Sequence, residues 1–248
     1  KGGQPLRLVM LDTPGYADFA GQVTAATRVA DAALIAVDAT AGIQVGTVRA
    51  WKRCEALGLP RAIAITGLDK ENADFDGTLA ALQEVWGVRC AAVTFPTDDK
   101  KGVVDVLTAQ GDRAEEARAK LTDVAAESSD ELIEKVLEGE ALTAEELAGG
   151  LRASVVQGKF IPVFAGAAKQ AMGLDELLQG FQRLMPSPAD RVVKDADGND
   201  VNPAADAPLV AQVWRSINDP FVGQLTLARV WGGTLKEKSE LFNSTQDQ

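Results

Sequence analysis

Short apolar runs alternate with helical stretches in the first hundred residues, and this alternation constrains the fold more than any other feature. The apolar runs have the length of buried strands and cover residues 6–11, 32–37, 61–65 and 91–95. The helical stretches between them cover residues 20–30, 45–57 and 73–86. Strands joined by helices of this length predict an α/β domain, a parallel sheet with helices on both faces.

The composition changes after this region. Residues 112–157 are rich in Ala, Glu and Leu, and they predict three helices at 112–126, 128–137 and 143–156. Strand and helix patterns return at 160–164 and 173–184, so we expect a helical insertion, at about 96–158, within a first domain of residues 1–187.

A Pro-Ser-Pro sequence at residues 186–188 predicts a domain boundary. Alternating apolar residues beyond it predict strands at 209–216, 223–231 and 241–242. Three short strands cannot close a barrel, so we expect residues 188–248 to be the opening strands of a larger β domain.

Composition excludes several function classes. The net charge is −11, which argues against attraction of the whole surface to nucleic acid, DNA included. Histidine is absent and the two cysteines, Cys54 and Cys90, lie far apart, which excludes structural zinc and histidine-dependent catalysis within these residues. Because we find no long apolar run and no signal-peptide pattern, we expect a cytoplasmic protein that does not contact membranes, with two reduced, buried thiols.

A candidate ligand-binding motif, Asp12-Thr13-Pro14-Gly15, directly follows the first apolar run. The carboxyl end of a strand is where open α/β sheets bind ligands. In nucleotide switches, an aspartate here lies near Mg²⁺, and a glycine lets its amide turn toward a γ-phosphate. Taken alone, the four residues also fit a plain turn between a strand and a loop.

Further segments occur in a characteristic order along nearly the whole chain. They read DTPGYADF at residues 12–19, ALIAVD at 33–38, LDKENADF at 68–75, PVFAGAA at 162–168 and DPFVGQLTLARVWGGTLK at 219–236. Together with the helical insertion at 128–148, they resemble elongation factor G from its second switch onward. The resemblance implies a P-loop NTPase-like G domain, incomplete here, followed by the start of a translation-factor β-barrel. It also implies GTP or GDP with Mg²⁺, GTP hydrolysis on the ribosome, and movement of tRNA and mRNA.

The resemblance places guanine recognition in two loops. The family motif NKxD falls on Thr66-Gly67-Leu68-Asp69, where Asp69 would accept hydrogen bonds from the guanine edge; a helix cap or turn is the alternative role. Gly67 lacks the lysine stem that packs on the base, and Thr66 lacks the asparagine amide. Each lost buried hydrogen bond costs about 1–3 kcal/mol. In Gly166-Ala167-Ala168, the family's serine hydroxyl is missing at Ala167, and the backbone N–H of Ala168 remains to contact the base.

This sequence also departs from the family pattern in the motifs that contact the phosphates. Residues 1–248 contain no GxxxxGK[ST] motif, and the family's first switch is also missing; we expect both to lie before Lys1 in a longer protein. Asp12 would contact Mg²⁺ indirectly. Tyr16 stands at the position of the histidine that orients the attacking water, and is either a weak catalytic candidate or a surface aromatic on a mobile loop.

Two hypotheses follow. The first is an elongation factor G-like GTPase that acts in translocation. The second is a ribosome-associated or regulatory paralogue with weak or lost nucleotide binding, which the residues at positions 16, 66, 67 and 167 favour. In both cases we predict that residues 1–248 alone do not hydrolyse GTP.

Overall fold

Four parallel strands form the central sheet of the computed structural model, which describes residues 7–195 and 197–246. Their order across the sheet is β1 (Ala33–Asp38), β2 (Arg61–Thr66), β6 (Ile161–Ala165) and β3 (Cys90–Ala92). All five residues of β6 are buried, which explains its continuous apolar sequence, since a strand covered on both faces meets no water. The expected parallel sheet is confirmed.

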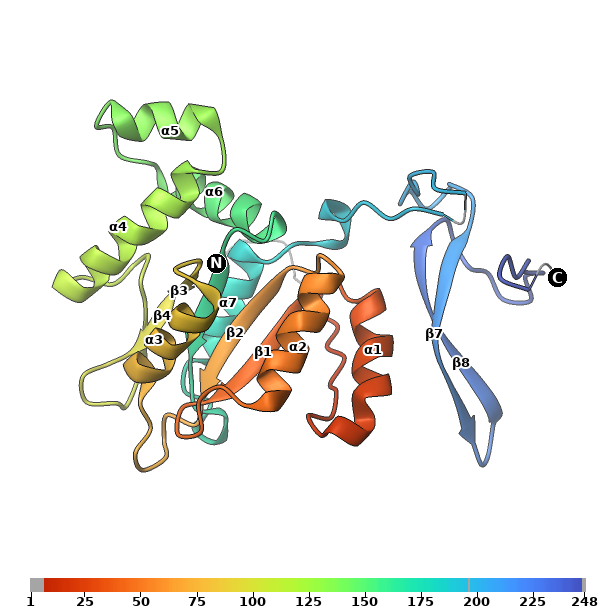
Figure 1. Cartoon of the computed structure of the whole chain (residues 1–248). Coiled ribbons are helices and arrows are strands. Elements are labelled where there is room, and N and C mark those ends of the chain that lie inside the picture. Colours follow the sequence, from red (N-terminus) through yellow and green to blue (C-terminus); the bar gives the residue numbers. More distant parts are fainter. Residues whose placement is uncertain (1–6, 196, 247–248) are drawn as a thin grey trace.

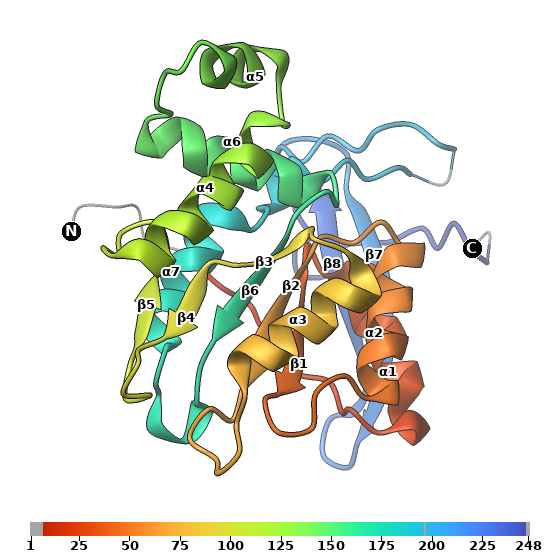
Figure 2. The ribbon, with the colours of Figure 1, turned by 60° about the vertical axis from the view of Figure 1, so that its left-hand side comes forward.

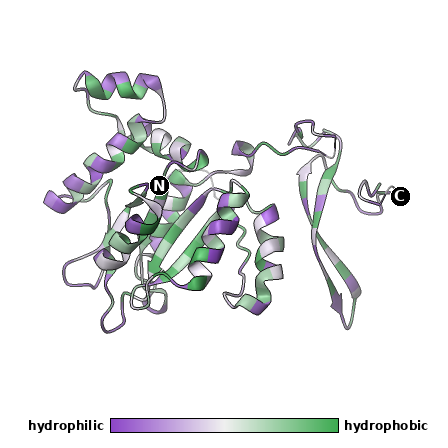
Figure 3. Cartoon of the chain, viewed as in Figure 1, coloured by the Kyte–Doolittle hydropathy of each residue, from purple (hydrophilic) through white to green (hydrophobic). Residues whose placement is uncertain are grey.

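Helices cover both faces of this sheet (Figures 1 and 2). The helices α2 (Val45–Ala56) and α3 (Phe75–Trp86) lie over one face, and α7 (Leu174–Leu184) lies over the other. The helix α1 (Ala20–Val29) lies beside α2, beyond the β1 edge of the sheet. A short turn, η1 (Ala17–Phe19), leads into α1. These boundaries lie within two residues of the predicted ones, and the sheet is mostly apolar in Figure 3.

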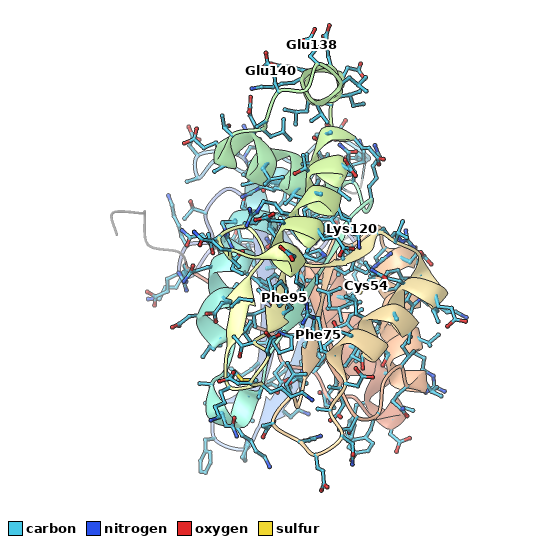
Figure 4. All side chains as sticks on the ribbon, turned by 90° about the vertical axis from the view of Figure 1, so that its left-hand side faces the viewer. Cys54, Phe75, Phe95, Lys120, Glu138 and Glu140 are labelled. Carbon is cyan, nitrogen blue, oxygen red and sulfur yellow. The ribbon has the colours of Figure 1, made fainter. Side chains whose placement is uncertain are left out.

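The insertion begins with an antiparallel pair, β4 (Thr94–Pro96) and β5 (Val103–Asp105). Three helices follow, at the predicted positions: α4 (Asp112–Ala126), α5 (Asp130–Leu137) and α6 (Ala144–Val156). The helix α5 has no buried residue and lies at the outer end of the molecule, where Figure 4 shows Glu138 and Glu140 just beyond it.

The strand predicted at residues 6–11 is wrong for the part that the structure describes; residue 6 lies outside the described residues. Residues 7–11 have no regular secondary structure, and Val9 and Met10 are 70% and 81% exposed. A strand requires a neighbour for its backbone N–H and C=O groups, and no described strand pairs with this segment.

Two other predicted strands also differ. The single strand at 91–95 is divided between β3, in the central sheet, and β4, which pairs with β5. Val93 lies at the division, where its N–H donates to Val163 and its carbonyl accepts from Val106, so the chain changes partners there. The strand predicted at 241–242 is wrong: Leu241 and Phe242 lie in an exposed loop with no neighbouring strand among the described residues.

The C-terminal segment forms an antiparallel hairpin of β7 (Val210–Asp219) and β8 (Gly223–Gly232). A linker containing the turn η3 (Pro188–Asp190) connects it to α7. Figure 1 shows the hairpin apart from the central sheet and beside α1, which contacts β7. The division into domains at residues 187 and 188 stays a prediction.

Candidate functional site

The carboxyl ends of β1, β2 and β6 bring together loops that are distant in sequence. The N–H of Ala39, just after β1, donates to the carbonyl of Thr66 at 2.8 Å. The N–H of Gly166 donates to Ile65 at 3.0 Å, and the N–H of Leu68 donates back to Gly166 at 3.4 Å. The two loops expected to recognise guanine are therefore joined backbone to backbone, because β2 and β6 are parallel neighbours.

The first loop, residues 66–69, presents a carboxylate to solvent. Leu68 is buried, whereas Asp69 is exposed and makes no hydrogen bond or ion pair within residues 7–195 and 197–246. The helix-capping alternative does not hold for Asp69, since Asp74 accepts the N–H of Gly77 at 2.9 Å and caps α3. Asp69 thus keeps its acceptor oxygens available to a ligand.

The second loop, residues 166–168, is closed by a pair of backbone hydrogen bonds between Ala167 and Met172, at 3.0 and 3.1 Å. Ala167 is 1% exposed, so its methyl group packs inside. Ala168 begins the turn η2 (Ala168–Gln170) and is exposed. Among the described residues, its N–H donates to no acceptor, so this N–H is available to a ligand.

An ion pair that the sequence interpretation missed lies beside the first loop. The ammonium of Lys70 donates to the carboxylate of Asp38, at the end of β1. Asp38 also accepts from the N–H and hydroxyl of Thr40, at 2.9 and 2.6 Å. The Lys70 hydrogen bond, followed by those from Thr40, holds the pKa of Asp38 well below its usual range. The sequence offered one signal for this ion pair, an aspartate at the end of a predicted strand. It did not identify the partner, because Lys70 lies thirty-two residues further along the chain.

The segment at residues 12–16 is separate from these loops. Asp12 and Gly15 are exposed, and Thr13 and Pro14 are half-buried. Tyr16 is 79% exposed, and its carbonyl accepts the N–H of Phe19 in the turn before α1. No hydrogen bond among the described residues joins this segment to either guanine loop.

The described residues include no group of three or more His, Cys, Asp or Glu side chains that could hold a metal ion. Mg²⁺ requires about six oxygen ligands in octahedral geometry, and Asp12 offers one carboxylate. Because Mg²⁺ usually keeps several waters and takes its other ligands from one or two carboxylates and from phosphates, Asp12 would supply only part of the ligand set.

The two loops expected to recognise guanine thus meet at the carboxyl edge of a parallel α/β sheet, which is where such sheets bind ligands. Residues 3–187 match the model of the elongation factor Tu GTP-binding domain, and the chain belongs to this family. The chain is 34% identical to elongation factor G of Fervidobacterium nodosum over 269 aligned positions, which cover 97% of this chain and 39% of that protein.

A solved structure supports the same assignment. The fold resembles a crystal structure from Thermus thermophilus with a TM-score of 0.79 and 33% identity, covering 91% of this chain and 35% of that one. The chain thus spans about two fifths of the length of the curated relative. The expected resemblance to elongation factor G and the α/β fold of a translational GTPase G domain are confirmed. Within the described residues, no helix is long and apolar enough to cross a membrane.

Proposed function

We propose that this chain forms part of an elongation factor G-like translational GTPase that binds guanine nucleotide and acts on the ribosome in translocation. The observation that carries this proposal is the backbone junction between residues 66–69 and 166–168, the two loops that we propose recognise the base. Membership of the elongation factor Tu GTP-binding domain family supports it. The proposal includes a cytoplasmic location.

Recognition of the base rests on complementary hydrogen bonds. The carboxylate of Asp69 accepts from the N1–H and amino group of guanine, and the N–H of Ala168 donates to the guanine carbonyl. Adenine presents the opposite pattern, with an acceptor at N1 and an amino group in place of the carbonyl. Each mismatched buried polar group costs about 1–3 kcal/mol, which favours guanine.

In the proposed site, the phosphates and Mg²⁺ would lie at the segment of residues 12–15, away from the two base loops. There Asp12 would contact the metal through water, and Gly15 would donate its N–H to a γ-phosphate. Mg²⁺ supplies charge neutralisation of the phosphates when bound. Thr13 and Pro14 lie between these two residues in the sequence, and Thr66, the last residue of β2, begins the loop at residues 66–69.

A second function is favoured by specific residues. Gly67 and Ala167 lack the side chains expected to contact the nucleotide, and Tyr16 is exposed without a side-chain hydrogen bond among the described residues. A regulatory paralogue with weak nucleotide binding would share the fold and would differ in affinity.

The first test is base selectivity. We expect the 248-residue chain to bind GDP more tightly than ADP in equilibrium dialysis taken to millimolar nucleotide. Asp69→Asn replaces an acceptor with an amide donor, so it should weaken GDP binding by about tenfold or more. The same variant should bind xanthosine diphosphate more tightly than GDP, because the xanthine base carries a carbonyl acceptor in place of the amino group. Asp206→Asn, at an exposed position in the C-terminal segment, is the matched control.

The outcomes separate the two functions. Equal binding of GDP and ADP, or an unchanged Asp69→Asn variant, would contradict the guanine site and favour the regulatory paralogue. The 248-residue chain should release no phosphate from GTP, because its residues include no GxxxxGK[ST] motif to hold the triphosphate. Measurable phosphate release would show that this expectation is wrong.

A further inference from the structure

The side chain of Lys70 lies over the backbone of Gly67. A Cβ atom built on Gly67 would stand 3.2 Å from Cε and 3.3 Å from Cδ of Lys70. Gly67 also has a φ of 78°, a left-handed conformation that residues with a Cβ rarely adopt. The methylenes of Lys70 therefore occupy the space that a side chain at position 67 would enter.

This lysine stem is held at both ends. The backbone N–H of Lys70 donates to the carbonyl of Gly67 at 3.0 Å, which closes the turn below the side chain. At the far end, the ammonium donates to Asp38, which Thr40 holds in turn. Because the stem is already ordered, a ligand that packs on it loses little additional side-chain entropy.

The chemistry of this surface suits a flat, partly apolar ring. Lysine methylenes form an apolar strip even where the charged end reaches water, and the Lys70 side chain remains 49% exposed. The ammonium is already paired with Asp38, so the stem is the part of Lys70 that stays available. The exposed carboxylate of Asp69 is adjacent in sequence and offers acceptors for the edge of the same ring.

We propose that Lys70 supplies the platform on which a purine base packs, while Asp69 reads the edge of that base. This inference rests on the proposed function, because it assigns a specificity-determining residue to the same guanine site. Asp38 is a positioning residue, since it acts by holding the lysine stem. The platform thus comes from a residue three positions after Gly67 and not from position 67 itself.

The experiment compares variants of the 248-residue chain in titrations with GDP and with guanosine. Lys70→Ala removes the stem and should weaken the binding of both ligands by about tenfold. This is the effect expected from losing contact with one or two methylenes. Lys70→Met keeps an unbranched apolar stem and should retain most of the affinity. Lys120→Ala is the control: this lysine also pairs with a carboxylate, Glu116, but lies on α4 (Figure 4).

Each outcome is decisive. Weakening of guanosine and GDP by the same factor supports a platform, because both ligands share the base. A loss confined to GDP, an Lys70→Met variant as weak as Lys70→Ala, or an Lys70→Ala variant as tight as the unmodified chain would overturn the inference and leave the guanine site in place. If the unmodified chain binds neither ligand, the inference and the proposed function fail together.

Discussion

Arg229 in β8 donates a hydrogen bond to the carboxylate of Asp31, 2.8 Å away, and so connects the hairpin to the end of α1. Its guanidinium also donates to the carbonyl of Val29, and Arg191 of the linker donates to Ala30. Both guanidinium groups stack on Trp231, at 3.9 and 4.8 Å from the ring centre. Two arginines from the C-terminal segment thus cap the C-terminus of α1, where the helix dipole favours positive charge.

The Arg229–Asp31 pair predicts a measurable loss of stability. Both side chains are about one fifth exposed, so Arg229→Ala removes a hydrogen-bond donor from the Asp31 carboxylate and the Val29 carbonyl in a partly dry environment. We expect the free energy of unfolding to fall by about 2 kcal/mol in urea titrations. Adding Asp31→Ala should then cost little more, and a fully additive double variant would show that the two residues act independently. Lys194→Ala, which breaks an exposed ion pair with Asp200, should change little.

The packing of α7 on β6 predicts that alanine destabilises one helical position. A Cβ on Gly180 would stand 2.2 Å from Cε1 of Phe164, a ring that is 1% exposed. Overpacking of this kind costs about 1–3 kcal/mol, more than the gain of about 1 kcal/mol in helix propensity. Gly180→Ala should therefore lower the melting temperature, whereas Gly149→Ala in α6, which meets nothing within 4 Å, should raise it. Equal shifts in both variants would contradict the close approach.

The ion pair between α5 and α6 predicts a pH dependence. The hydrogen bond from Lys135, followed by those from the N–H and hydroxyl of Thr143, lowers the pKa of Glu146 from 4.5 to about 2. A carboxylate with a depressed pKa stabilises the fold above its unfolded pKa, and this contribution is lost as the pH falls from 4.5 toward 2. The melting temperature of the Glu146→Gln variant should therefore fall less steeply over this pH range than that of the unmodified chain. Glu145→Gln, at the exposed neighbouring position, is the control.

The turn after residues 166–168 contains a strained alanine. Ala171 has a φ of 52°, and the left-handed conformation costs a residue with a Cβ roughly 1–2 kcal/mol. Ala171→Gly relieves this cost, although glycine loses more entropy on folding, so we expect a gain of up to about 1 kcal/mol. A lower denaturation midpoint in urea would show that the Ala171 methyl group contributes packing that outweighs the strain.

The sequence predicted correctly those helices and strands whose signals lie within their own residues, such as an apolar run or a capping box. The strand β6 is apolar throughout because it is covered on both faces, and Thr143 caps the N-terminus of α6 in a capping box with Glu146. The segment at residues 7–11 is equally apolar, yet it has no strand partner among the described residues. Apolar composition predicts burial, whereas strand formation depends on a neighbour that composition does not specify.

For the candidate site, sequence alone determined the family and the two loops, because the motifs at residues 66–69 and 166–168 are local and ordered along the chain. The tertiary structure decided which side chains meet there. Lys70 reaches Asp38 because β1 and β2 pair in parallel and end together, and it covers Gly67 because that residue turns left-handed. Contacts of this kind depend on strand register and backbone conformation, so they follow from the assembled fold and not from spacing in the sequence.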